Sequence, residues 1–180
     1  MNRTFFSLGL VLVLLALMPW PALATDANGN HDTYQVLIGT GGTTSHPMGP
    51  DVATAPNGST VSLVASGTFN AGPDKTASGG GTFTIKDPSG HTVASGALTI
   101  NSVLGFVDYG NGTPEGFPAS THGGQGKFGV TLAGVGDGVL TVFCLLGSPP
   151  PSKEEGITLI LGNGMNFTEQ TSGETVYILL

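Results

Sequence analysis

A chain of 180 residues with five basic and twelve acidic side chains has a formal net charge of −7. Because lysine and arginine are so few, we expect no charge-driven interface with nucleic acid or with an anionic membrane surface. The single cysteine, Cys144, excludes an intramolecular disulfide. A chain of this length can nevertheless bury roughly two-thirds of its unfolded surface, which is enough for one hydrophobic core.

The first 24 residues have the pattern of a secretory signal peptide. Arg3 provides a short basic start, residues 8–18 are apolar, and Ala22 and Ala24 precede the expected cleavage point. The apolar run is too short to span a bilayer comfortably. We therefore predict a signal peptide over residues 1–24 and a single all-β domain over residues 25–180. The expected location is secreted (extracellular, periplasmic or cell surface), with no membrane span after cleavage.

Alternation of apolar and polar residues predicts strands along the rest of the chain and no further helix. In chain order, the expected strands are residues 34–38 and 60–69, two arms of a hairpin over residues 77–100, and residues 103–109, 127–133, 139–146, 157–161, 165–169 and 174–180. Between them we expect a long irregular loop over residues 110–126 and an exposed polyproline-like connection over residues 148–155. The last three strands are expected to form a meander.

The hairpin over residues 77–100 has the clearest local pattern. Phe83 and Ile85 alternate with polar neighbours, and residues 87–90 (Asp-Pro-Ser-Gly) have the composition of a turn. Because the apolar parity changes across residues 94–96, we predict a β-bulge there. The fold class expected for the whole is a single-domain antiparallel β-sandwich or small β-barrel of about nine or ten strands, and the sequence leaves these two open.

Several segments resemble those of a group of uncharacterised secreted prokaryotic proteins with an all-β fold. They are ASGGGTFTIKD (residues 77–87), VASG (residues 93–96), CLLGSPP (residues 144–150) and EEGI (residues 154–157). The resemblance extends over much of residues 25–180. It implies secretion and a β fold, and it implies no activity, ligand or catalytic residue.

The candidate binding residues bracket the long loop: Asp108, Tyr109, Glu115 and His122. Two carboxylates, a phenol and an imidazole provide groups for acid–base chemistry or for holding one metal ion. We predict that they converge at one end of the fold and line a pocket. The competing interpretation is a solvated loop that carries ordinary polar side chains.

Metal binding has little support in the sequence, and we expect no cofactor. His46 and Met48 offer an imidazole and a thioether, which suit copper. A blue-copper site also needs a histidine closely after its cysteine, whereas Cys144 is followed by Leu145 and Leu146. Cys144 lies in an apolar run and is expected to be a buried thiol.

Catalytic signatures are absent: the chain has no Gly-x-Ser-x-Gly, no His-Glu-x-x-His and no phosphate-binding loop. The favoured function is a secreted β-domain with a structural, adhesive or ligand-binding role. The alternative is a small secreted cyclase-like or hydrolytic enzyme with a pocket near residues 108–126. The partner is unknown, and the terminal strands over residues 34–38 and 174–180 offer edges for self-association.

Overall fold

The computed structural model describes residues 32–43 and 46–180. The predicted signal peptide, residues 1–24, lies outside the described residues. The described part consists almost entirely of antiparallel strands, with one short 3-10 helix, η1 (Thr113–Glu115). In this part of the chain, no helix has the length and apolar character needed to cross a membrane.

Thirteen strands are present in the described residues, and the expected all-β antiparallel fold is confirmed. They are β1 (Thr33–Ile38), β2 (Gly42–Thr43), β3 (His46–Pro47), β4 (Asp51–Thr54), β5 (Thr60–Asn70), β6 (Ala77–Lys86), β7 (Thr92–Asn111), β8 (Thr121–Leu132), β9 (Gly136–Cys144), β10 (Gly156–Leu161), β11 (Asn166–Phe167), β12 (Glu169–Ser172) and β13 (Thr175–Leu179). Of the strands of two to four residues, β11 lies within the strand expected over residues 165–169, and the others are too short for alternation to reveal them.

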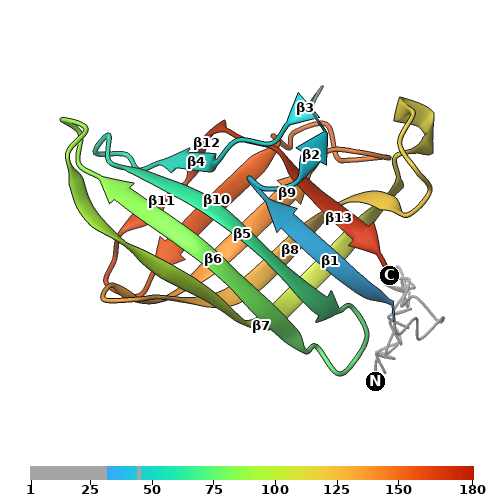
Figure 1. The fold of residues 1–180 in the computed structure, drawn as a ribbon, viewed down its shortest axis with the longest axis horizontal. Coiled ribbons are helices and arrows are strands. Elements are labelled where there is room, and N and C mark those ends of the chain that lie inside the picture. The colour runs from blue at the N-terminus through green and yellow to red at the C-terminus, as the bar shows by residue number, and fades with distance from the viewer. Residues whose placement is uncertain (1–31, 44–45) are drawn as a thin grey trace, which may run out of the picture.

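Six strands pair in a closed cycle, so that the main sheet curls partly into a ring (Figure 1). β5 pairs with β6, β6 with β7, β7 with β8, β8 with β13, β13 with β1, and β1 again with β5. Beyond this ring, β9, β10 and β11 continue the sheet from β8, and β4 and β12 continue it from β5. Closing a sheet removes open edges, which otherwise expose unpaired backbone groups.

The terminal strands are not edges, and this corrects the expected surface for self-association. β1 lies between β13 and β5, and β13 lies between β8 and β1. The predicted meander is also wrong, because β11 returns to β10 but the third expected strand, β13, pairs with β8 and β1. The reason is that strand partners far apart in the sequence leave no local signal, while hairpin chemistry does.

The hairpin of β6 and β7 is confirmed, but the bulge is misplaced in the prediction. The Gly90 N–H donates to the Asp87 carbonyl oxygen at 2.9 Å, closing the expected turn. The register shifts at Val93, between the pairs Ile85–Ala94 and Lys86–Thr92, and residues 94–96 pair regularly. Val93 is largely exposed, so it is the extra residue and does not belong to the apolar face.

The predicted seventeen-residue loop is largely wrong. β7 continues as one strand to Asn111, with register shifts that absorb its parity changes, and β8 begins at Thr121. Only residues 112–120 lie between the two strands. The first half of β8 escaped prediction because it contains Gly123, Gly124 and Gly126, which have no side chain to show alternation.

Aromatic side chains pack together in the interior next to β1. Phe69 contacts the rings of Tyr34, Phe106, Phe128 and Tyr177, with centroid distances between 5.0 and 5.9 Å. Such contacts stabilise a core beyond the area that they bury.

Tyr177 also ties the backbone of the ring together. Its hydroxyl accepts from the Gly126 N–H at 2.9 Å and donates to the Val142 carbonyl oxygen at 3.0 Å. A Cβ atom on Gly126 would lie 2.7 Å from that hydroxyl, so glycine is needed for this close approach. Nearby Cys144 is buried as expected, and burial, with the neighbouring Glu155, raises its pKa to about 12.

Candidate functional site

Two of the predicted site residues, Asp108 and His122, form a hydrogen-bonded pair. His122 Nδ1 lies 3.0 Å from Asp108 Oδ1 and 3.1 Å from Asp108 Oδ2. Asp108 comes from the last part of β7 and His122 from the start of β8, where His122 pairs with Asn111 on β7 and with Tyr177 on β13. The Asp108–His122 pair therefore lies where three strands of the ring meet.

Tyr34, on β1, completes this site and was not predicted. Its hydroxyl donates to Asp108 Oδ2 at 3.2 Å, and its ring meets the His122 ring edge-on at 5.7 Å. Burial of Tyr34, together with the Asp108 charge, raises its pKa, so the phenol stays protonated at neutral pH. The alternation in residues 34–38 shows that Tyr34 points inward, but no local signal joins it to Asp108.

The Asp108–His122 pair is held by the buried Tyr34 on one side and is partly exposed to solvent on the other. The side chain of His122 is 12% exposed and that of Asp108 is 36% exposed, whereas Tyr34 is almost fully buried. An ionised carboxylate only accepts, so Nδ1–H of His122 is the donor to Asp108, and in the neutral tautomer that carries this proton the lone pair is on Nε2. Chemically, such a ring can accept a proton or a hydrogen bond from a bound molecule.

The other two predicted residues do not join this pair. The Tyr109 hydroxyl donates to Gln125 Oε1 at 3.4 Å, and burial raises the pKa of Tyr109. Glu115, on η1, accepts from the Gly147 N–H at 3.2 Å and so ties the 112–120 connection to the segment after β9. The prediction that four groups converge is thus met by Asp108 and His122 alone.

The structure shows no metal centre among the residues that it describes. In that part of the chain, no three His, Cys, Asp or Glu side chains are arranged to hold a metal ion. The side chain of His46 lies outside the described residues, and Met48 is partly buried. The predicted pairing of His46 with Met48 stays a prediction.

The space beneath the Asp108–His122 pair is filled by rings. Tyr34 stacks on Phe69 at 5.6 Å and contacts Phe106 at 4.8 Å between ring centroids. Two surface hollows have other linings, one around residues 49–52 and 172–174 and one around residues 68–70 and 76–78. A molecule that contacts the Asp108–His122 pair would therefore lie on the outer surface of the protein and not inside the ring of strands.

A scan against protein-family models found no match to the chain, and neither the curated proteins nor the solved structures gave a significant match.

Proposed function

We propose that this protein is a secreted β-domain that works by binding a ligand at its surface. Secretion is supported by the signal-peptide pattern of residues 1–24. Binding is supported by the Asp108–His122 pair, which is held in place by Tyr34 and stays accessible.

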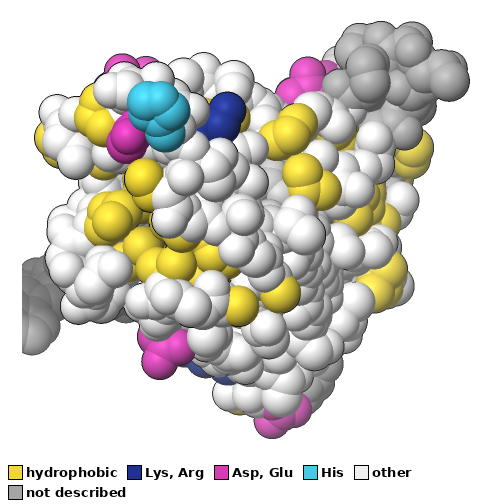
Figure 2. Space-filling view, turned by 60° about the vertical axis from the view of Figure 1, so that its left-hand side comes forward, with side chains coloured by type: hydrophobic (Ala, Val, Ile, Leu, Met, Phe, Trp, Pro, Cys, Tyr) yellow, Lys and Arg dark blue, Asp and Glu magenta, His cyan; other side chains and the backbone are white. Residues whose placement is uncertain are grey.

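The single observation that carries the proposal is that packed aromatic side chains, and not a cavity, lie under the Asp108–His122 pair. Deep pockets that bury most of a small ligand are the usual setting of catalysis, whereas the rings of Tyr34, Phe69 and Phe106 fill the space here. On the face shown in Figure 2, charged side chains are few and hydrophobic side chains gather near its middle. Because the chain has a net charge of −7, uncharged polar ligands with hydrogen-bonding groups, such as saccharides, suit the Asp108–His122 pair better than polyanions do.

The test has two parts. The protein recovered outside the producing cells should begin near residue 25, as measured by intact mass, and retention of residues 1–24 would contradict secretion. Binding to a panel of soluble oligosaccharides should be measured by calorimetry for the wild type, His122→Gln and His91→Gln. His91 is a matched control because it also faces a carboxylate, Asp87, but on an exposed turn. Loss of binding in His122→Gln alone supports the proposal, and equal loss in both variants contradicts it.

A second candidate, a small acid–base enzyme, is favoured by one specific observation. Asp108 orients His122 through Nδ1, as a carboxylate does in many hydrolytic sites, and this leaves Nε2 to act as a base. Hydrolysis of chromogenic esters by the wild type and by His122→Gln tests it. Turnover that falls at least a hundredfold in the variant supports an enzyme, and equal rates reject one.

A further inference from the structure

A buried carboxyl group without partners lies on β4 and does not belong to the Asp108–His122 pair. Asp51 begins β4, has 0% exposure, and neither of its carboxyl oxygens has a hydrogen-bond partner. Burial raises the pKa of Asp51 to about 8, and repulsion from Glu155 and Glu174 adds to this rise. The Gly39 amide moderates the rise, although it makes no complete hydrogen bond to the carboxyl. An unpartnered buried carboxyl is costly, so its presence requires an explanation.

Two further carboxylates lie close to Asp51. Glu155 turns inward from the predicted exposed connection and accepts from the Leu145 N–H at 2.6 Å and from the Thr175 N–H at 3.1 Å. It also accepts from the Thr175 hydroxyl at 2.8 Å, so its position is fixed between β9 and β13. Glu174 is exposed on the segment between β12 and β13. Its charge acts on both Asp51 and Glu155.

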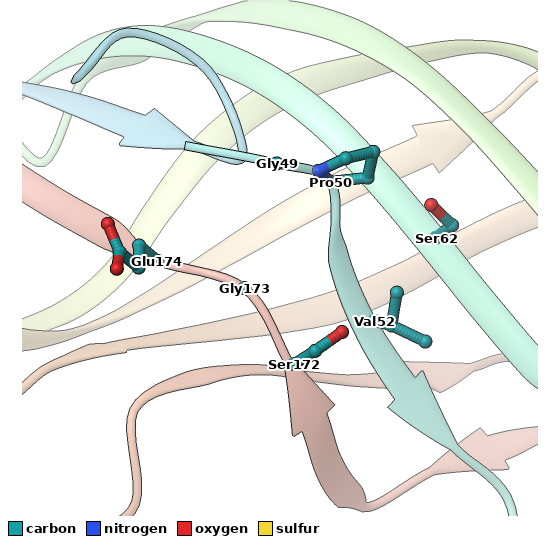
Figure 3. A pocket seen from close by; sticks show the side chains of 7 residues that line it. All are labelled: Gly49, Pro50, Val52, Ser62, Ser172, Gly173 and Glu174. Carbon is teal, nitrogen blue, oxygen red and sulfur yellow. The ribbon is translucent and has the colours of Figure 1, made fainter. Parts of the chain in front are cut away.

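A surface hollow adjoins these carboxyl groups. It has a volume of about 540 Å³ and is lined by Gly49, Pro50, Val52, Ser62, Ser172, Gly173 and Glu174. Figure 3 shows Pro50, Val52 and Ser62 on one side and Ser172 and Glu174 on the other. The hollow is open to solvent, so a ligand bound in it would stay partly exposed.

Gly173 connects the hollow with the buried carboxyl. It lines the hollow, has a φ of 122°, and a Cβ atom on it would overlap the carboxyl group of Asp51. Only Gly173, which has no side chain, therefore separates the Asp51 carboxyl group from the hollow. None of the residues that line the hollow is basic, so the three carboxyls have no counter-charge there.

We propose that this hollow binds a small organic cation, with its ammonium group at Glu174 and its aliphatic part on Pro50 and Val52. Asp51, once it is ionised, attracts the ammonium group from behind Gly173. An ammonium group needs only a few oxygen acceptors, and Glu174 and Ser172 provide them on the same side of the hollow. A metal ion is disfavoured, because no three acidic, histidine or cysteine side chains of the described chain are arranged to hold one.

Binding and the ionisation of Asp51 are coupled. A cation favours the charged carboxylate, so the ligand should release a proton from Asp51 and bind more tightly as the pH rises through about 8. An aliphatic amine remains protonated in this range, because its pKa is about 10. The increase in affinity should therefore reflect the protein and not the ligand.

The experiment compares 1,6-diaminohexane with 1,6-hexanediol, which has the same length and no charge, by calorimetry on the purified protein. We expect the diamine to bind, the diol not to bind, and Glu174→Gln to weaken the diamine at least tenfold. Glu154→Gln, which removes an equal charge from an exposed position, is the control and should leave the affinity unchanged. Equal affinity for diol and diamine, or no effect of Glu174→Gln, would overturn the proposal.

Two more measurements separate this site from its alternatives. Asp51→Asn should remove the rise in affinity between pH 6 and pH 9, and an unchanged rise would overturn the role of Asp51. If calcium chloride binds in a way that depends on Glu174 while the diamine does not bind, the hollow is a metal site and the proposal fails. Should Asp51→Asn not fold, the comparison of diol, diamine and Glu174→Gln still decides the question.

Discussion

His122 Nδ1 lies 3.0 Å from Asp108 Oδ1, although the two residues are 14 positions apart and belong to different strands. The 112–120 connection brings β8 back along β7, and the register places Asp108 opposite Gly124, close to His122. Since Gly124 has no side chain, Phe106 packs against it and against Tyr34, which contacts both Asp108 and His122. The site is thus a product of strand pairing and not of a mobile loop.

The first prediction concerns the tautomer of His122. In the wild type, Asp108 accepts from Nδ1–H, so the neutral ring should be the Nδ1-protonated form. Asp108→Asn removes the charged acceptor and should increase the Nε2-protonated form. Two-dimensional ¹H–¹⁵N spectra of the imidazole measure both forms. An Nε2-protonated ring in the wild type would show that Asp108 does not orient it.

The second prediction is a dependence of stability on pH that arises from Asp51. Its pKa is about 8 in the folded protein and 3.8 as the unperturbed value, so the folded state binds a proton more tightly than the unfolded state. The free energy of unfolding should therefore be highest below pH 4 and fall as the pH rises towards 8, by an amount on the order of a few kcal/mol. The raised pKa of Glu155 adds a decrease in the same direction.

Urea unfolding between pH 4 and pH 9 measures this decrease. Asp51→Asn should flatten it, because the amide does not titrate. Asp87→Asn, on an exposed turn, serves as the control and should keep the wild-type slope. A wild-type stability that rises between pH 4 and pH 8 would show that Asp51 is ionised throughout.

The third prediction concerns the hydroxyl of Tyr177. Tyr177→Phe leaves the Gly126 N–H and the Val142 carbonyl oxygen without this partner inside the core. We expect a loss of about 1–3 kcal/mol in the free energy of unfolding, measured with urea. Tyr109→Phe is the matched control, because its hydroxyl makes only one long hydrogen bond, and it should cost less. An equal cost for both variants would contradict the role given to Tyr177.

The fourth prediction compares two glycines with positive φ. Gly173→Ala places a Cβ atom against the Asp51 carboxyl and also strains the backbone, so we expect a loss of about 3 kcal/mol or more. Gly134→Ala lies on an open turn with a φ of 76° and should cost only about 1 kcal/mol. Thermal unfolding of both variants tests this difference. Equal losses would mean that Asp51 does not pack against Gly173.

Local pattern was sufficient for some parts of this fold and insufficient for others. Alternation over residues 60–69 predicted nearly the whole of β5 (Thr60–Asn70), and Asp-Pro-Ser-Gly predicted the turn after β6. The start of β8 was missed because its glycines have no side chains, so the alternation of apolar and polar residues typical of a strand is absent there. The interior position of β1 was missed because its partners, β13 and β5, are set by the closure of the sheet.

The same distinction holds for the candidate sites. Asp108 and His122 were predicted to converge because both flank one chain reversal, and such neighbours are close in any hairpin. Tyr34 was missed because it reaches Asp108 across the ring. Asp51 was missed because it follows a segment rich in glycine and proline, where a charged residue is normally solvated, and only the pairing of β4 with β5 and β12 buries it.

The central claim is that the Asp108–His122 pair binds a ligand at the surface of the ring, and a map of backbone amide shifts in ¹H–¹⁵N spectra tests it most directly. The protein is titrated with the tightest-binding oligosaccharide of the calorimetric panel. We predict shifts centred on Tyr34, Asp108 and His122 that vanish in His122→Gln and persist in His91→Gln. Shifts centred elsewhere, or unchanged in His122→Gln, would contradict the claim.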